Sequence, residues 1–332
     1  MNAPFLAGSF ASKVVMIVVR ALSSSKRFLK PLGLVWLGVF ACVAVHASET
    51  QWQSHAQPVF LSPLGNSPPI EGQVDTILED QQGFIWLVAA NGLWRWDSKS
   101  LVRARFEGAD NEAPAPQVNH GFSDAKGRIW IGTSNGLYRL TPGTSSFTAV
   151  APGQLQNITV QAGTVISLPH TDIVILASDR TLYQFDTASA QLKQLPIAPN
   201  ARIHALHVSQ ANTLWVGTDK GLYRSDLNKN RFAPLQIAPG FPEGIRVSAI
   251  TSTAKENLVV GTAAEGLFVQ SEASGFRHYT LAQDDSPWLF TVTEIRPDVL
   301  LIGTFGDGLI ELNLANQTTR RFQHNRLLPA SL

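Results

Sequence analysis

The residue types that most often carry out catalysis are sparse and scattered in this sequence. His204 and His207 are three residues apart on a predicted strand, so they point to opposite faces and do not chelate one metal ion. Asp284 and Asp285 are adjacent in a predicted loop, which is typical of solvated turn residues. Seven histidines follow residue 47: His55, His120, His170, His204, His207, His278 and His324. Their spacing predicts no metal site.

Motifs for cofactor or nucleophile chemistry are also absent from the sequence. There is no glycine-rich phosphate loop, no nucleophile elbow and no zinc-ligand spacing. Asp-x-x-Gly segments recur, but they are too short and too poor in oxygen ligands for a calcium loop. The sequence therefore predicts no catalytic residue and no cofactor, and we do not expect this chain to be an enzyme.

Binding is a better-supported expectation, because equivalent places in a repeat carry polar and aromatic residues. Each copy of this repeat, which is about 43 residues long, begins with a predicted strand, called strand a. The residues just before strand a are Gln73, Gln117, Ala162, Arg202, Arg246 and Trp288. The second residues of strand a are Asp75, Asn119 (followed by His120), Thr164, His204, Ser248 and Phe290.

These residues are predicted to meet at the rim of a central channel. Hydrogen-bonding groups beside aromatic faces suit a sugar or a small carboxylate. An ordinary alternative stays open, because residues that face any water-filled channel are polar whether or not a ligand binds there. The rim residues are Gln73, Asp75, Gln117, Asn119, His120, Arg202, His204, Arg246 and Trp288.

The repeat itself predicts a β-propeller. It has a period of about 43 residues, as expected for four-stranded blades. Helical repeats have similar periods, but Asn91-Gly92 and Asn135-Gly136 between apolar runs are hairpin turns in which both residues tolerate positive φ. We therefore expect an all-β chain of antiparallel blades, with six blade cores near 74–107, 118–150, 163–195, 203–237, 247–281 and 289–324.

Recurring residues inside the repeat are assigned structural roles. Asp80-x-x-Gly83 and Asp124-x-x-Gly127 form a second turn, in which Asp bonds its own backbone and Gly takes the left-handed position. The buried strand b carries a tryptophan that we expect to wedge between adjacent blades. These strand-b residues are Trp86, Trp130 and Trp215, and the glycines are Gly132, Gly217, Gly261 and Gly303.

Composition agrees with a folded domain that does not bind nucleic acid. Of 332 residues, 44% are hydrophobic and 15% are charged, which favours a well-buried core. There are 26 basic and 25 acidic residues without a basic stripe, so neither nucleic acid nor an anionic membrane surface is an expected partner. The single cysteine, Cys42, lies in the N-terminal apolar stretch, so the rest of the chain forms no disulfide.

The first 47 residues are predicted to be a secretory signal peptide. Lys26, Arg27 and Lys30 precede an uncharged apolar run over residues 31–45, and small residues then offer a cleavage site after Ala47. Two alternatives stay open, namely an uncleaved membrane anchor and lipidation at Cys42. Residues 48–56 are read as a linker, and residues 57–332 as the propeller.

Strand counting suggests that the ring is incomplete. Residues 58–64 look like a fourth strand with no first three before it, and residues 327–332 resemble the approach to another strand a. A seven-bladed ring closed by the N-terminal strand needs one more set of three strands, because an open ring exposes edge strands. We expect the natural chain to continue past Leu332; the alternative is a closed six-bladed ring.

The segment Asp124–Arg139 resembles the two-component regulator propeller repeat, and Trp215–Arg224 resembles its second half. Blade 3 departs most, since it lacks both the tryptophan and the turn glycine. The resemblance implies a periplasmic sensor of a small molecule or glycan fragment. It also implies an output domain or partner protein at the inner membrane, such as a histidine kinase or diguanylate cyclase, and leaves a homodimer open. A propeller-type lyase or lactonase, and a stand-alone interaction scaffold, are the alternatives.

Overall fold

The computed structural model describes most of the chain beyond residue 70. The described residues are 70, 74–97, 99–107, 116–167, 171–195, 200–228, 231–233, 235–271, 275–281 and 287–323. The expected signal peptide (1–47), the linker (48–56) and the N-terminal strand (58–64) lie outside them, as do Gln73 and the segment after residue 323. Those predictions therefore stay predictions.

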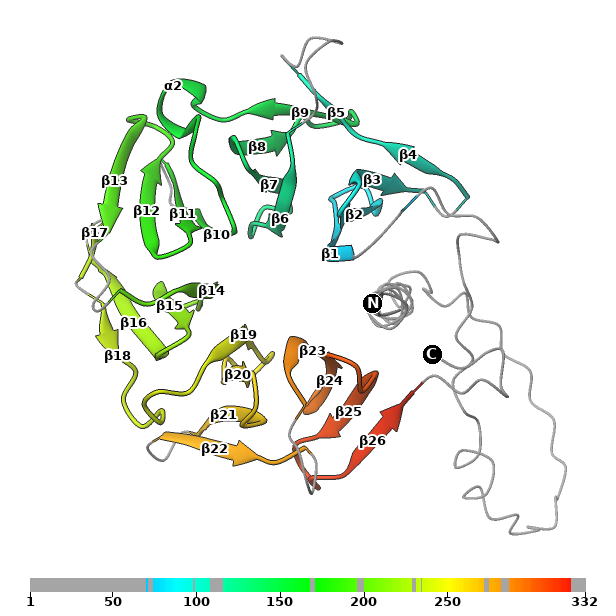
Figure 1. Cartoon of the computed structure of the whole chain (residues 1–332), viewed down its shortest axis with the longest axis vertical. Coiled ribbons are helices and arrows are strands. Elements are labelled where there is room, and N and C mark those ends of the chain that lie inside the picture. Colours follow the sequence, from blue (N-terminus) through cyan, green and yellow to red (C-terminus); the bar gives the residue numbers. More distant parts are fainter. Residues whose placement is uncertain are drawn as a thin grey trace, which may run out of the picture.

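Six antiparallel sheets radiate around a common centre, which confirms the predicted β-propeller (Figure 1). Blade 1 contains β1 (Val74–Glu79), β2 (Ile85–Ala89), β3 (Gly92–Trp96) and β4 (Leu101–Arg103). Blade 2 contains β6 (Val118–Ser123), β7 (Ile129–Thr133), β8 (Gly136–Leu140) and β9 (Ser146–Ala149). Blade 3 contains β10 (Ala162–Ser167), β11 (Asp172–Ser178), β12 (Thr181–Asp186) and β13 (Gln191–Leu195).

The other three blades follow the same order. Blade 4 contains β14 (Ile203–Val208), β15 (Thr213–Thr218), β16 (Gly221–Asn228), β17 (Arg231–Phe232) and β18 (Gln236–Ile237). Blade 5 contains β19 (Val247–Ser252), β20 (Leu258–Thr262), β21 (Leu267–Ser271) and β22 (Gly275–Tyr279). Blade 6 contains β23 (Leu289–Arg296), β24 (Val299–Thr304), β25 (Leu309–Asn313) and β26 (Thr319–Phe322).

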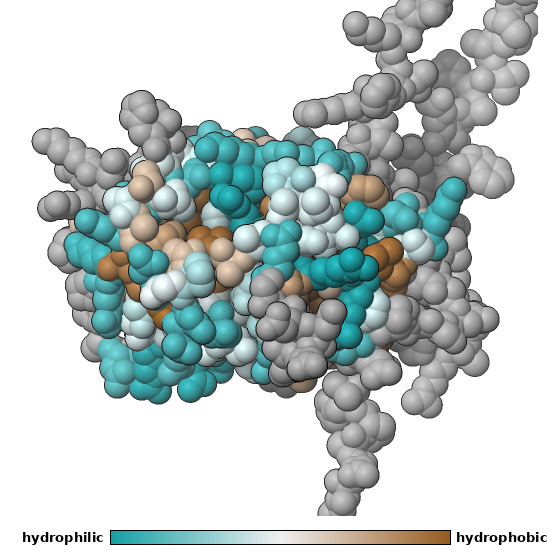
Figure 2. Space-filling view, turned by 90° about the horizontal axis from the view of Figure 1, so that it is seen from above, coloured by the Kyte–Doolittle hydropathy of each residue, from teal (hydrophilic) through white to brown (hydrophobic). Residues whose placement is uncertain are grey.

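The outermost strands depart from the plain pattern. Phe106, expected as the trailing residue of blade 1, belongs to the short strand β5 (Arg105–Phe106), which pairs in parallel with β9 of blade 2. In blade 4, β17 and β18 each pair with a different part of β16. A single helical turn, α2 (Pro152–Leu155), follows β9. Figure 2 shows one side of the molecule edge-on, where hydrophilic areas alternate with smaller hydrophobic ones.

The Asp-x-x-Gly turn links the sequence motif to the blade core. The Asp124 carboxylate accepts hydrogen bonds from the backbone N–H groups of Lys126 and Arg128, each at 2.9 Å. Its second oxygen accepts the indole N–H of Trp130 at 3.0 Å. Asp80 does the same for Trp86 at 2.8 Å. One carboxylate thus shapes the turn and satisfies the only polar atom of a buried tryptophan.

The Gly-Thr-x-x-Gly segment is also explained by hydrogen bonds. The Thr133 hydroxyl donates to the Gly136 carbonyl at 3.0 Å, and the backbone N–H of Asn135 donates to the same hydroxyl at 3.0 Å. Only Gly136 of the Asn-Gly pair has positive φ, at 95°, so Asn135 does not adopt the left-handed conformation expected for it. Equivalent threonines close the same turn at Thr218, Thr262 and Thr304.

The hydrophobic core lies between blades. Trp130 is fully buried and packs with Phe122 of its own blade and with Val165 and Phe185 of blade 3. Trp86 and Trp215 occupy the same place between blades 1 and 2 and between blades 4 and 5. Because each of these three blades presents its strand-b indole to the next blade, successive blades are held face to face around the ring.

Five neighbouring pairs of blades are joined through the strands nearest the centre. Strand β1 contacts β6, and contacts continue through β10, β14 and β19 to β23. The described residues leave an open sector between the sheets of blade 1 and blade 6 (Figure 1). The prediction of a seventh blade concerns residues outside the described ones and stays a prediction.

Candidate functional site

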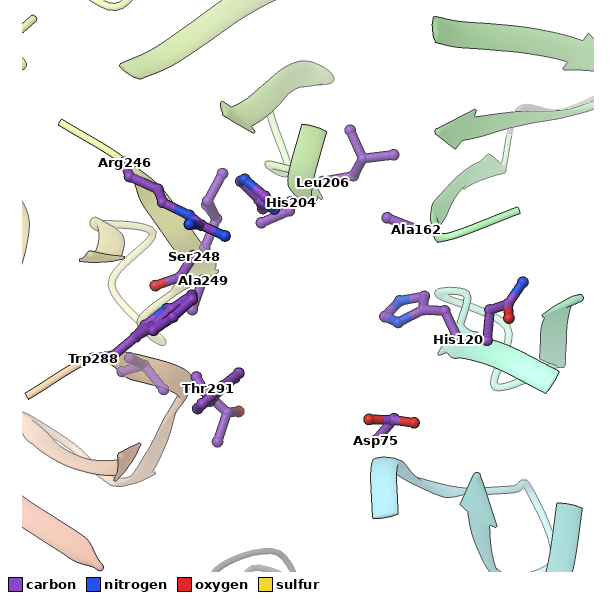
Figure 3. Close-up of a pocket in the computed structure, with 15 residues that line it drawn as sticks. Asp75, His120, Ala162, His204, Leu206, Arg246, Ser248, Ala249, Trp288 and Thr291 are labelled. Atoms are coloured by element: carbon purple, nitrogen blue, oxygen red, sulfur yellow. The ribbon is translucent and has the colours of Figure 1, made fainter. Parts of the chain in front are cut away.

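A cavity of about 430 Å³ opens where the strands a meet at the centre of the ring. Every blade contributes to its wall through the start of its innermost strand (Figure 3). The lining residues include Asp75, Asn119, His120, Ala162, His204, Leu206, Arg246, Ser248, Trp288, Phe290 and Thr291. The cavity is therefore formed by residues far apart in the sequence.

A repeated β-bulge places one extra side chain from each of five blades at this cavity. The pairing of strand a with strand b shifts register directly after the first residue of strand a in blades 1, 2, 4, 5 and 6. A bulge leaves one residue outside the ladder and re-aims its side chain. The residues at these five positions, all of which line the cavity, are Asp75, Asn119, His204, Ser248 and Phe290.

Blade 3 has no such bulge at the start of its strand a, and this corrects the alignment of the six repeats made from the sequence. Strand β10 begins at Ala162, which pairs with Ala177, and the pairing continues without a shift. Ala162 is thus the first residue of strand a, where the alignment had placed it just before the strand. Thr164 is the third residue, where the second was expected. Blade 3 contributes only the small side chain of Ala162 to the wall, whereas the other five blades contribute larger or polar side chains.

The structure brings together six of the nine predicted rim residues. Asp75, Asn119 and His120 line the cavity from blades 1 and 2, and His204, Arg246 and Trp288 line it from blades 4, 5 and 6. Gln117 and Arg202 lie just before their strands but are not among the lining residues. Gln73 lies outside the described residues.

Sequence reasoning missed the lining residues that follow the bulge. Leu206, Ala249, Thr291 and Val292 lie beyond the second residue of their strands, so an alignment of strand starts did not select them. Phe305 does not line the cavity, but it follows β24 and packs against the lining residue Phe290, with ring centres 5.7 Å apart. No periodic signal marks Phe305, because a turn rather than a strand positions it.

Some lining side chains also hold neighbouring blades together. The Ser248 hydroxyl donates to the Leu289 carbonyl of blade 6 at 2.5 Å. The Asn119 amide donates to the Val160 carbonyl, next to blade 3, at 3.3 Å. The ordinary structural interpretation of the polar rim therefore applies to Ser248 and Asn119. Hydrogen bonds of this kind do not account for His204 and Trp288, whose Nε2 and Nε1 atoms have no partner among the described residues.

Arg246, Trp288 and His204 form the most distinctive part of the wall. The Arg246 guanidinium lies over the Trp288 ring, 4.5 Å from its centre. Burial lowers the pKa of His204, and the positive charges of Arg246 and Arg202 lower it further, so its imidazole is neutral at pH 7. Within the described residues, His204 Nε2 and Trp288 Nε1 are buried atoms without a hydrogen-bond partner. Both are polar atoms that a ligand or water can satisfy.

The described residues contain no group of three or more His, Cys, Asp or Glu side chains placed to hold a metal ion. In the same part of the chain, no helix has the length and hydropathy needed to cross a bilayer.

Comparisons with known proteins relate the chain to other propellers by structure. No family model matches the sequence, and no curated protein matches it. One similar structure is the extracellular domain of a protein assigned as a one-component system from B. thetaiotaomicron, with TM-score 0.61, 19% identity and 78% of this chain covered. Another is the extracellular domain of a hybrid two-component system from the same organism, with TM-score 0.59 and 21% identity over 78% of this chain.

Propellers of other kinds match to a similar degree. Streptogramin B lyase has a TM-score of 0.61 at 12% identity, covering 76% of this chain and 83% of the lyase. At these identities the likeness establishes the fold alone, which is that of a β-propeller. The chain spans about a third of the length of those extracellular domains, 34% in the first and 36% in the second.

Proposed function

We propose that this chain is the ligand-sensing propeller of an exported signalling protein. In this proposal a small molecule, such as a glycan fragment, binds in the cavity at the centre of the ring. Its occupancy is passed to an output domain or partner protein at the inner membrane, with a histidine kinase or diguanylate cyclase as the output class. The convergence of five bulged strands on one cavity is the observation that carries the proposal.

The bulges support binding because the pairing of strands a and b does not require them. A regular ladder pairs every residue of strand a, as β10 does in blade 3. In the other five blades the ladder is interrupted at the same position, and the extra residue lines the cavity. Bulges are common beside binding and active sites for this reason. A cavity of this volume also lies within the range of small-molecule sites.

The remaining parts of the proposal rest on the sequence and on the fold comparison. The predicted signal peptide supports export to the periplasm, with tethering to the inner membrane if the signal stays uncleaved. Propellers in the extracellular domains of signalling systems share the fold. A homodimer is included as a way in which ligand occupancy could be transmitted, because such assemblies are commonly symmetric.

A thermal-shift screen of small sugars, sugar acids and organic acids tests ligand binding directly. A ligand at about 100 times its Kd stabilises the native state by about 2.7 kcal/mol, which raises Tm measurably. We expect Trp288→Ala to weaken the response, whereas Val102→Ala, at an exposed site on the outer strand β4, leaves it unchanged. Equal responses of both variants would place binding elsewhere, and a screen without any response would contradict the proposal.

A lyase is the second candidate, favoured by one observation. The fold matches streptogramin B lyase over most of that enzyme's length, and the cavity here holds two histidines, His120 and His204. A neutral His204 imidazole is the protonation state that a general base requires. Incubation with a streptogramin B antibiotic, followed by liquid chromatography, tests this candidate. Loss of the intact antibiotic that disappears in His204→Ala would favour the lyase over the sensor.

A further inference from the structure

The cavity has two chemically different sides. Arg246, His204 and Trp288 lie together on the side of blades 4 to 6, whereas Asp75 and His120 lie on the side of blades 1 and 2 (Figure 3). A positive charge therefore stands on one wall and a carboxylate on the opposite wall. Such an arrangement orients a ligand that carries its charge at one end.

The two arginines predicted at the rim are in different situations. Arg202 Nε lies 2.8 Å from Asp179 Oδ1, so its charge is balanced within blades 3 and 4. The Arg246 guanidinium has no ion pair and no hydrogen bond to the part of the chain that the structure describes. The guanidinium lies instead over the face of Trp288. Arg246 is thus the cation whose five N–H donors are available to a ligand.

Stacking holds the Arg246 guanidinium in one place before a ligand arrives. A guanidinium on an indole face is favourable, and the contact restricts the long side chain. Less conformational entropy is then lost when its N–H groups bind an anion. A planar fork of donors matches a carboxylate, whose two oxygens can accept two parallel hydrogen bonds.

An aromatic surface adjoins this cation. Trp288 is stacked on Phe290, with ring centres 5.5 Å apart and an angle of 9° between the ring planes. Phe305 lies beside both rings at 50–51° to them. Phe290 is 39% exposed and Phe305 is 54% exposed, although large aromatic side chains favour burial. Phe290 lines the cavity and therefore offers an apolar face beside the stacked Arg246 and Trp288, while Phe305 packs against Phe290 outside the lining.

We infer that the ligand of this cavity is a ring that carries one carboxylate, with the carboxylate on Arg246 and the ring against Phe290. The inference rests on the proposed ligand-binding function and narrows it. Neutral sugars lack the group that Arg246 binds. A second carboxylate is disfavoured, because the opposite wall holds Asp75. Sugar acids and aromatic acids share this chemistry.

Calorimetric titration with two matched pairs of probes tests the inference and distinguishes the two ligand classes, sugar acids and aromatic acids. Glucuronate is compared with glucose, and 4-hydroxybenzoate with 4-hydroxybenzamide. We expect at least one acid to bind about 10- to 100-fold more tightly than its neutral partner, as expected for loss of hydrogen bonds to a charged group. Arg246→Gln should weaken binding of that acid by a similar factor.

Arg202→Gln is the matched control, because Arg202 lies nearby but is paired with Asp179 and does not line the cavity. We expect it to change the affinity by less than about threefold. If neither acid binds, the inference is overturned. It is also overturned if an acid and its neutral partner bind equally well and Arg246→Gln leaves their affinities unchanged. Tight binding of glucose or the amide would overturn only the inference, because the ligand-binding function would stand.

Discussion

At the scale of single residues, the repeat motif works by giving one side chain several partners. Asp124 shapes a turn, bonds the indole of Trp130 and forms an ion pair with Arg128 at 2.6 Å. The Trp130 ring is also flanked by the guanidinium groups of Arg128 and Arg139, at 5.5 and 5.4 Å. Replacing one member therefore disturbs several contacts at once.

Replacing Trp130 with alanine should be strongly destabilising. The side chain is fully buried between blades 2 and 3, so its loss leaves a large cavity and removes one of the two hydrogen bonds to Asp124 Oδ2. We expect a loss of about 3–5 kcal/mol in the free energy of unfolding, measured by urea denaturation. Phe305→Ala, at a 54% exposed site, should cost less than about 1 kcal/mol. Similar losses in both variants would contradict the assigned role of Trp130.

His207 should make the protein less stable in mild acid. Burial lowers its pKa to about 4, from an ordinary value of 6.5, and its Nε2 lies 2.6 Å from Ser252 Oγ of the next blade. Between these two values the unfolded chain binds the proton more readily than the folded chain. The effect of His207 on the free energy of unfolding is therefore absent above pH 6.5. As the pH is lowered towards 4, the free energy of unfolding falls by up to about 3 kcal/mol.

The corresponding measurement compares the wild type with His207→Gln at pH 7.5 and pH 5. The variant should lose less stability on acidification, although His204, whose pKa is also lowered, keeps part of the effect. Parallel losses in the two proteins would show that His207 does not cause the pH dependence.

At the scale of strands, the close approach of blades depends on glycine in strand b. A Cβ atom on Gly132 would lie 2.9 Å from the Val160 carbonyl oxygen and 2.6 Å from Val160 Cγ1. Gly217 is similarly crowded by Val247 of blade 5. Since the central strands converge towards the channel, side chains must be smallest where the blades are closest together.

Gly132→Ala should cost about 1–3 kcal/mol, because the backbone of Val160 cannot yield as a flexible side chain would. Gly153→Ala serves as the control, since no heavy atom lies within 4 Å of the added Cβ atom in α2. We expect the control to change the free energy of unfolding by less than about 0.5 kcal/mol in the same urea titrations. Equal stability of the two variants would show that the blades can separate without cost.

At the scale of the whole molecule, ion pairs between blades supplement the apolar core. Arg128 lies 2.7 Å and Lys126 lies 3.1 Å from the Asp172 carboxylate of blade 3. Burial alone would raise the pKa of Asp172, but the hydrogen bonds from Arg128 and Lys126 hold it below its usual value. The charged pair at the interface of blades 2 and 3 is thus formed at neutral pH.

A double-mutant cycle with Arg128→Gln and Asp172→Asn should reveal coupling between the two blades. Removing Arg128 leaves the carboxylates of Asp124 and Asp172 nearly buried, so we expect a loss of about 2–4 kcal/mol. The coupling energy should be about 1–2 kcal/mol. Lys255→Gln removes an exposed ion pair with Asp298, between blades 5 and 6, and should cost at most about 1 kcal/mol. A coupling energy near zero between Arg128 and Asp172 would contradict a stabilising contact between blades 2 and 3 through this ion pair.

The fold was predictable from sequence because its rules are local. Asp124 and Gly127 specify a turn, Gly136 specifies a hairpin, and the run from Ile129 to Thr133 specifies a buried strand. Repetition of these signals every 43 residues or so then implies a propeller. Even blade 3, without the tryptophan or the turn glycine, forms four regular strands, because its strand b is apolar throughout.

The candidate site was only partly predictable, because tertiary structure decides it. Sequence alignment placed Asp75 and His204 at equivalent positions, but it could not show a bulge that depends on pairing between strands. It also treated Arg202 and Arg246 alike. Only the folded chain pairs Arg202 with Asp179 and stacks Arg246 on Trp288. Sequence by itself determined the blades through short-range turns and periodicity, whereas contacts between distant blades determined the chemistry at their centre.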